Sequence, residues 1–207
     1  MRISKAAAAA NRERVLEVAT RLFREKGIDG VGVADLMSEA GLTHGGFYNH
    51  FQSKEELVAE ACKIAFDAAI ARLQNNVANA KTKSSAKAES MHDVFAHYVD
   101  RYLSLDTRDA PGRSCPMAAL GTDAARHGPP VKDVFADGVK RYLDAFQDVV
   151  PIAQGKAAKP RKRVQTIATL STLIGALTLA RAVAGADEKL SKEILAAARV
   201  RLLEVDA

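Results

Sequence analysis

Tryptophan is absent from this sequence, and proline and aromatic residues are scarce. Among its 207 residues there are 6 prolines, and 5% of the residues are aromatic. Proline removes a backbone donor and clashes inside a helix, so the long proline-free stretches favour helices. Because no segment shows convincing strand alternation or an internal repeat, we predict an all-α protein of about nine helices.

Cysteine is also rare, with only Cys62 and Cys115, which lie far apart in the sequence. A secreted disulfide scaffold normally carries more cysteines, which indicates a reducing interior. The alanine run near the N-terminus is too short for the apolar core of a signal peptide and is followed by charged residues at positions 12–14. We therefore expect a cytoplasmic protein.

The first 60 residues lack an excess of either charge, although the formal net charge of the chain is +5. They hold 8 basic and 9 acidic residues, and the other 147 residues hold 22 and 16. With 48% hydrophobic and 27% charged residues the chain has an ordinary globular balance, which excludes wholesale disorder. An interaction with nucleic acid must therefore be argued from where residues are placed, because the total charge does not indicate it.

Apolar residues recur at helical spacing in most of the chain. Gly27 is placed to end the first helix in a left-handed conformation, and Gly41 to end the second. Ser53 and Glu56 have the spacing of a capping box, which opens the fourth helix. The expected helices cover residues 12–26, 33–40, 43–50, 53–77, 91–105, 117–126, 131–150, 164–184 and 191–203.

The most informative segment is VADLMSEAGLTHGGFYNHFQSK, residues 33–54. Two short helices separated by the turn AGLT predict a helix-turn-helix, whose second helix enters the major groove of DNA. Thr43 is expected to cap this second helix, and Phe47 and Phe51, one turn apart, to anchor it. A glycine-rich loop between core helices is the structural alternative.

The other side chains of this second helix suit contact with a DNA duplex. Tyr48, His50 and Lys54 can donate hydrogen bonds to phosphates, and Lys54 lies at a helix N-terminus that itself attracts phosphate. His44 and Asn49 are candidates for contacts with base edges, and the glycines let the backbone approach closely. Taken alone, His50 would also fit a buried core histidine.

The segment resembles the DNA-binding domain of the TetR family of transcriptional repressors, over about residues 12–60. The family's turn corresponds to residues 40–43, its aromatic recognition helix to residues 47–51 and its S-K-E-x-L continuation to residues 53–57. The resemblance implies phosphate contacts by Thr43, Tyr48, His50 and Lys54, and groove contacts by His44 and Gly45.

The chain departs from the family at the start of the second predicted helix. The family usually has a serine or threonine cap near a phosphate, where this chain has Gly32, and often a basic residue two positions later, where this chain has Ala34. Both backbone contacts are missing, so we expect a lower non-specific affinity for DNA than is usual in the family.

The resemblance also implies how the chain is organised. We expect a DNA-binding domain over residues 1–52 and a helical effector-binding and dimerisation domain over residues 53–207. The last two helices resemble the pair through which the family forms a homodimer, which would place two recognition helices about 34 Å apart on a pseudo-palindromic operator. The expected interface residues are Ile167, Leu170, Ile174, Gly175, Leu177, Ile194, Leu195 and Leu202.

The same resemblance implies a small-molecule effector, which the sequence does not identify. Its pocket is expected between the middle helices, although the aromatic stripes there fit plain core packing equally well. Cys115 follows Arg113 at a helix start and is a candidate oxidant or electrophile sensor, but a small buried residue is the simpler interpretation. The pocket candidates are Phe95, Tyr98, Tyr102, Cys115, Met117, Phe135 and Tyr142.

Other classes of protein fit the sequence less well. His92 and His97 fall on different helix faces without a thiol or carboxylate cluster, so we predict no metal and no other cofactor. No phosphate loop or Ser-His-Asp arrangement is recognisable, which leaves an enzyme using Cys115 as a remote alternative. Residues 164–184 are long enough to span a bilayer, but they include Arg181, and burial in a subunit interface explains them without a membrane.

The sequence thus predicts a ligand-responsive DNA-binding regulator, a repressor that a small molecule releases from its operator. A role as an activator stays open. An architectural DNA-binding protein without an effector is the main alternative, but the large C-terminal region exceeds what DNA binding and dimerisation need.

Overall fold

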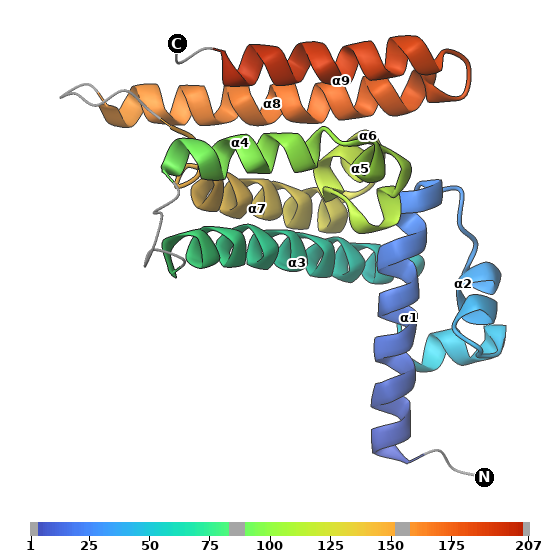
Figure 1. The fold of residues 1–207 in the computed structure, drawn as a ribbon. Helices are drawn as coiled ribbons and strands as arrows, with labels where there is room; N and C mark the ends of the chain where they lie inside the picture. Colours follow the sequence, from blue (N-terminus) through green and yellow to red (C-terminus); the bar gives the residue numbers. More distant parts are fainter. Residues whose placement is uncertain (1–3, 83–89, 152–157, 205–207) are drawn as a thin grey trace. The chain divides into compact units, whose positions relative to one another are not determined.

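The computed structural model describes residues 4–82, 90–151 and 158–204, and within these ranges all regular structure is helical (Figure 1). This confirms the predicted fold class. The α-helices are α1 (Lys5–Lys26), α2 (Val33–Glu39), α3 (Lys54–Thr82), α4 (Met91–Tyr102), α5 (Leu105–Asp109), α6 (Pro116–Arg126), α7 (Pro129–Phe146), α8 (Ala158–Ala184) and α9 (Glu188–Leu203). Two 3-10 helices, η1 (His44–Asn49) and η2 (Pro111–Arg113), complete the set in the described part of the chain.

The chain divides into two compact units. The first unit comprises Met1–Asp67 and Pro111–Val139, and the second comprises Ala68–Ala110 and Lys140–Ala207. The chain passes from one unit to the other within α3 and within α7. The boundary predicted between residues 52 and 53 divides a DNA-binding domain from an effector-binding and dimerisation domain, and it stays a prediction.

Several predicted helix ends were wrong: α3 continues to Thr82, α7 ends at Phe146 and α8 begins at Ala158. At three further ends a capping side chain marks a different limit. Helix α1 begins at Lys5, where Ser4 accepts a hydrogen bond from the Ala7 backbone and an alanine run with high helix propensity follows. The predicted helix over residues 91–105 ends at Tyr102, because Ser104 caps the separate helix α5. Helix α9 begins after Asp187, which accepts from the Leu190 backbone at 2.9 Å.

The two glycines that were expected to end helices both have positive φ. Gly41 has φ 69°, and Gly27 has φ 77° with an extended ψ of 161°. Gly27 therefore ends α1 in a conformation that side-chain-bearing residues rarely adopt, although its ψ is not that of the left-handed helix.

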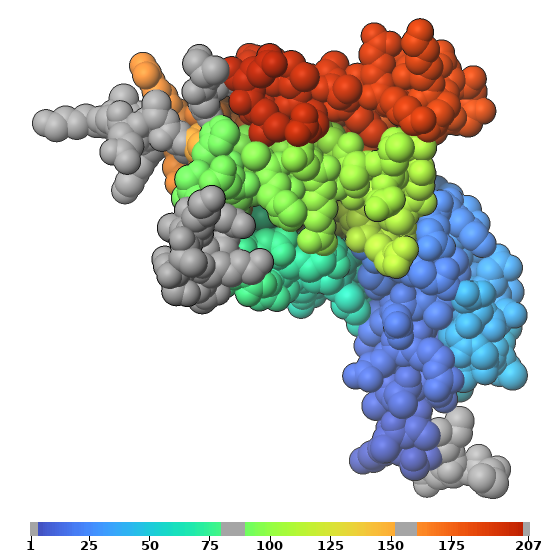
Figure 2. All heavy atoms as spheres, in the orientation of Figure 1, coloured from blue at the N-terminus to red at the C-terminus, as the bar shows by residue number. Residues whose placement is uncertain are grey.

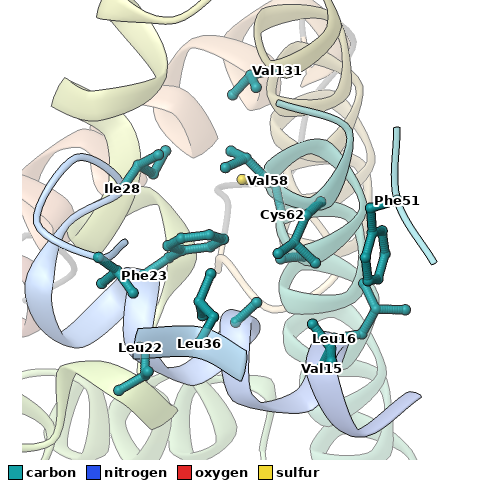
Figure 3. Packing of buried hydrophobic residues seen from close by; sticks show 14 of the residues in the cluster. Val15, Leu16, Leu22, Phe23, Ile28, Leu36, Phe51, Val58, Cys62 and Val131 are labelled. Atoms are coloured by element: carbon teal, nitrogen blue, oxygen red, sulfur yellow. The ribbon is translucent and has the colours of Figure 1, made fainter. Parts of the chain in front are cut away.

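The core of the first unit joins α1 to α2, η1 and the beginning of α3 (Figure 3). Val15 and Phe23 supply the apolar stripe of α1, Leu36 comes from α2, and Val58 and Cys62 come from α3. Burial raises the pKa of the Cys62 thiol to about 12, so the side chain acts as a core residue rather than as a nucleophile.

In the second unit, α8 and α9 pack side by side as an antiparallel pair (Figure 1). The buried Arg108 bonds α5 to α9: its guanidinium donates to Asp109 and Glu188 at 2.7 Å and to the Ser191 hydroxyl at 2.9 Å. Hydrogen bonds to these two carboxylates raise the pKa of Arg108 above its usual range. Ser191, expected at the start of a helix, is a buried residue whose hydroxyl donates to the Ala180 carbonyl.

Candidate nucleic-acid interface

Helix η1 follows α2 after the turn at residues 40–43, which gives the predicted helix-turn-helix. It is a 3-10 helix, held by bonds from Gly46 N to the Thr43 carbonyl and from His50 N to the Phe47 carbonyl, both 2.9 Å. Thr43 occupies the N-cap position with extended backbone, but its side chain makes no capping hydrogen bond. The six residues of η1 include two glycines, which disfavour a regular α-helix in so short a segment.

Two aromatic side chains anchor η1 to the core of the first unit, as predicted. Phe47 is fully buried, and Phe51 lies beside it with a ring-centroid distance of 5.5 Å. Because both rings belong to the core of the first unit, the short helix is held by tertiary packing rather than by its own helix propensity.

The opposite side of η1 faces solvent. Tyr48 is 68% exposed and contacts the ring of Phe47 edge-on at 5.2 Å between centroids. The predicted contact residues Thr43, His44, Gly45 and Asn49 are also exposed, and His50 is half-buried. The structure therefore brings these six residues together on η1 and its two caps, with the side chains of Thr43, His44, Tyr48 and Asn49 exposed.

Arg12 of α1 fixes the end of η1, a role that the sequence analysis missed. Its Nε donates to the His50 carbonyl at 3.3 Å, and its terminal nitrogen pairs with Glu60 of α3 at 2.5 Å. The guanidinium also lies 4.6 Å from the centroid of the Phe51 ring, a cation–π distance. The sequence signal was a basic residue one turn before the apolar stripe of α1, which a long surface side chain also explains.

Lys54, the first residue of α3, donates from its ammonium to the Ile28 carbonyl at 2.8 Å. An ammonium has three N–H donors, so this bond leaves two for another acceptor and orients the group. Ser53 caps α3 as predicted, accepting from Glu56 N at 3.1 Å, whereas the Glu56 carboxylate accepts from Gln52 N instead of completing the predicted capping box at Ser53.

The N-terminus of α2 carries an acidic side chain. Asp35 accepts a hydrogen bond from Gly32 N at 3.2 Å, and neither Gly32 nor Ala34 offers a polar side chain. A carboxylate at this position satisfies the helix terminus and repels a phosphate. The structure thus agrees with the sequence, in which the two expected phosphate contacts at the start of α2 are missing.

Helix α6 is bonded to the segment before α2, and the turn between α6 and α7 is bonded to the start of α3. Asp123 accepts from Ile28 N at 3.2 Å, while Glu55 accepts from Gly128 N at 2.9 Å and contacts His127 Nδ1 at 3.2 Å. None of these residues was singled out from the sequence, because their partners lie 72 to 95 positions away.

The candidate effector residues are divided between the two units. Within the second unit, the hydroxyls of Tyr98 and Tyr142 are 2.7 Å apart, and Tyr98 stacks near Tyr102 and Phe146 at 5.8 and 5.0 Å between centroids. Phe95 is buried in the same unit. Cys115, Met117 and Phe135 belong to the first unit, where Phe135 packs edge-on against Phe66.

The predicted dimer residues differ in burial. Leu170, Leu177 and Leu195 are buried within the protomer, whereas Ile167 is 43% exposed. The predicted residues Ile174, Gly175, Ile194 and Leu202 are half-buried. Further exposed apolar side chains on α8 and α9, missed in the sequence analysis, are Val164, Leu179, Leu190 and Val200.

Two features weighed in the sequence have plain structural outcomes. Among the described residues no group of three or more His, Cys, Asp or Glu side chains is arranged to hold a metal ion. Residues Arg161–Ala184 of α8 form the one described helix that is long and apolar enough to cross a membrane, and a single such helix is weak evidence for a membrane protein.

Known proteins with similar sequences match the N-terminal part of the chain, which contains the helix-turn-helix. A family model described as bacterial regulatory proteins, tetR family, matches residues 15–61. The HTH-type transcriptional regulator YerO of Bacillus subtilis is 34% identical over 64 residues, which are 31% of this chain and 22% of that protein. The HTH-type transcriptional repressor KstR2 of Mycolicibacterium smegmatis is 33% identical over 66 residues, 32% of each chain.

The chain therefore spans a third or less of the length of these curated relatives. Its fold extends the likeness: the crystal structure of E. coli NemR in its reduced form superposes with a TM-score of 0.74, covering 95% of this chain and 96% of that one at 17% identity. The family match covers the segment that holds the exposed η1 and its buried aromatic anchors, and the likeness of fold extends over nearly the whole chain.

Proposed function

We propose that the protein is a DNA-binding transcriptional repressor that dissociates from its operator when a small molecule binds. The observation that carries the proposal is the split of η1 between Phe47, which is fully buried, and Tyr48, which is 68% exposed. A core helix would bury both aromatic rings. A reading helix needs one ring for support and leaves its polar groups for DNA.

The contacts with DNA follow from the exposed groups. Tyr48, His50 and the oriented ammonium of Lys54 donate to phosphates and set the register, and the hydroxyl of Thr43 adds a fourth donor. His44 and Asn49 face the base edges of the major groove, and Gly45 lets the backbone approach. The relatives named as transcription regulators support this role, and the name of KstR2 includes repression.

A homodimer completes the reading unit. The exposed apolar side chains of α8 include Val164 and Leu179, and a Cβ added to Gly175 between them would meet no atom within 4 Å. Such a face, with a glycine that permits close approach, suits packing against a second copy of the α8–α9 pair. The dimer would bind a pseudo-palindromic operator with half-sites about one DNA turn apart.

The effector site is proposed at the tyrosine cluster of the second unit, where the bonded hydroxyls of Tyr98 and Tyr142 offer polar groups within an aromatic surrounding. Helix α3 is continuous from Lys54 to Thr82 and passes from the first unit into the second. A ligand that reorients α3 would change the spacing of the two reading helices, so effector and operator affinities are reciprocally coupled.

The test is binding of the full chain to DNA flanking its own gene, titrated with salt and then challenged with candidate ligands. Specific binding whose affinity falls steeply with salt, and which a ligand weakens, is the expected result. Absence of specific binding to that DNA and to a randomised operator library would overturn the proposal. Tight binding that no ligand in a broad screen changes would favour the architectural alternative.

A further inference from the structure

The first turns of α1 are largely exposed to solvent among the described residues. The earliest buried residue of α1 is Val15, although the helix begins at Lys5. Residues 5–10 are exposed apart from Ala8, which is half-buried. In the space-filling view these turns extend beyond the rest of the first unit (Figure 2). An alanine run supports helix here without tertiary contacts, because alanine has the highest helix propensity.

One face of this extension continues the face that contacts η1. Residues spaced by three, four or seven positions share a helix face, so Lys5, Ala8 and Arg12 lie in one row, which Leu16 continues into the core. Arg12 in this row bonds the His50 carbonyl at the end of η1. Lys5 lies two turns, about 10 Å, farther along the same row. Arg14 falls on the opposite face.

The charges of the first unit indicate which kind of molecule this row would bind. The N-terminus of α2 carries Asp35 and no hydroxyl or basic side chain. The extension of α1 presents the exposed ammonium of Lys5 together with the positive end of the α1 helix dipole. A negatively charged polymer that lies against Tyr48 and His50 and continues past Arg12 would reach Lys5 next.

We propose that the Lys5–Arg12 face of α1 is a second DNA contact, which binds the phosphate backbone next to the segment gripped by η1. Ala8 and Ala9 keep this face free of bulk, so the helix can approach the sugar–phosphate chain, and Lys5 supplies the charge. The contact replaces the phosphate anchor that α2 lacks. This inference rests on the proposed DNA-binding function and adds a surface to it.

The test compares two lysine or arginine deletions on opposite faces of one helix. We expect Lys5→Ala to reduce the slope of log K against log salt by about one and to weaken binding about tenfold near 0.1 M salt, at every DNA sequence. Arg14→Ala is the matched control and should leave both quantities unchanged. Removing a cation from the first turn does not weaken the helix, because the dipole disfavours cations there.

A second pair of variants tests the approach of the backbone. Ala8→Glu should weaken DNA binding by more than Lys5→Ala, whereas Ala10→Glu, on the far face, should leave it within twofold of the wild type. Thermal unfolding followed by circular dichroism verifies that all four variants fold. If the wild type binds DNA and Lys5→Ala and Ala8→Glu bind as it does, the second contact is refuted while the proposed function stands; a wild type that binds no DNA refutes both.

Discussion

Neighbouring residues in and beside η1 differ in burial, and the difference matches their proposed roles. Phe47 and Phe51 hold the helix on the core, whereas Tyr48 and His44 stay accessible. His50 stands between these groups, since its carbonyl is held by Arg12 and its ring is half-buried. Such an arrangement suits a residue that fixes position, with base reading left to more exposed neighbours.

Substitutions at the two histidines should therefore differ in kind. His50→Ala removes a phosphate donor and is expected to weaken binding to all sequences by about 1 kcal/mol, roughly fivefold. His44→Ala should instead flatten the preference at one operator position by about 1–3 kcal/mol. Affinities measured on a set of single-base operator variants distinguish the two. Equal losses across all sequences for both variants would contradict these roles.

Thiol reactivity gives a second residue-scale prediction. The folded-state pKa of Cys62 is raised to about 12 by burial, so almost no thiolate exists at pH 8. We expect Cys62 to resist iodoacetamide in the native protein at pH 8 and to react promptly in denaturant, where its pKa returns to about 8.5. Mass spectrometry of the alkylated peptides reads this out, and fast labelling of native Cys62 would show that the core opens readily.

What the sequence reveals at this scale depends on the distance between partners. The burial of Phe47 and Phe51 was predictable, because two aromatics one turn apart in a short polar helix have few other roles. Arg12 was not predictable, since its partners His50 and Glu60 are 38 and 48 positions away. A single sequence does not say which cation meets which carbonyl.

Among the elements, the ends of helices departed most from expectation. Local caps such as Ser4, Ser104 and Asp187 decide these ends, and each competes with an apolar pattern that runs past it. Likewise, η1 is a 3-10 helix with two glycines, and the packing of Phe47 and Phe51 holds it in place. Periodicity located the longer helices, but it missed the separate short helices α5 and η2 and several helix limits.

The buried guanidinium of Arg108 bonds α5 to α9. Arg108→Met removes its hydrogen bonds to Ser191 and to two carboxylates while keeping much of the side-chain volume. We expect the free energy of unfolding to fall by about 2–3 kcal/mol, the usual value for a buried charge-assisted hydrogen bond. Urea unfolding measures it. A loss below 0.5 kcal/mol, on the order of an exposed surface pair, would mean that the network is not stabilising.

For the whole molecule, the proposed dimer explains why α8 is apolar on most sides. One side packs within the protomer through buried residues such as Leu170 and Leu177, and the other exposes Val164 and Leu179. The sequence identified the helix but not which of its sides is buried in the protomer, because residues that are apolar all round the helix do not mark one face. The interface is therefore proposed on the exposed residues rather than on the buried leucines.

A charge on that exposed side should separate the protomers. Leu179→Glu places a carboxylate at a side chain that is 58% exposed in the protomer and would be desolvated in the dimer. We expect a monomer in size-exclusion chromatography with light scattering, and operator affinity well below that of the wild type. Met91→Glu is the control, at an apolar residue of α4 that is 38% exposed. A Leu179→Glu protein that remains dimeric would place the interface elsewhere.

The most direct test of the whole account is photocrosslinking from η1. A photoreactive aromatic amino acid replaces the exposed Asn49, and a second protein carries the same group at exposed Met91 of α4. Irradiation with operator DNA is predicted to join position 49 to bases of the major groove and to leave position 91 unlinked. Absence of crosslinks from position 49, in a protein that binds the DNA, would contradict the claim that η1 reads it.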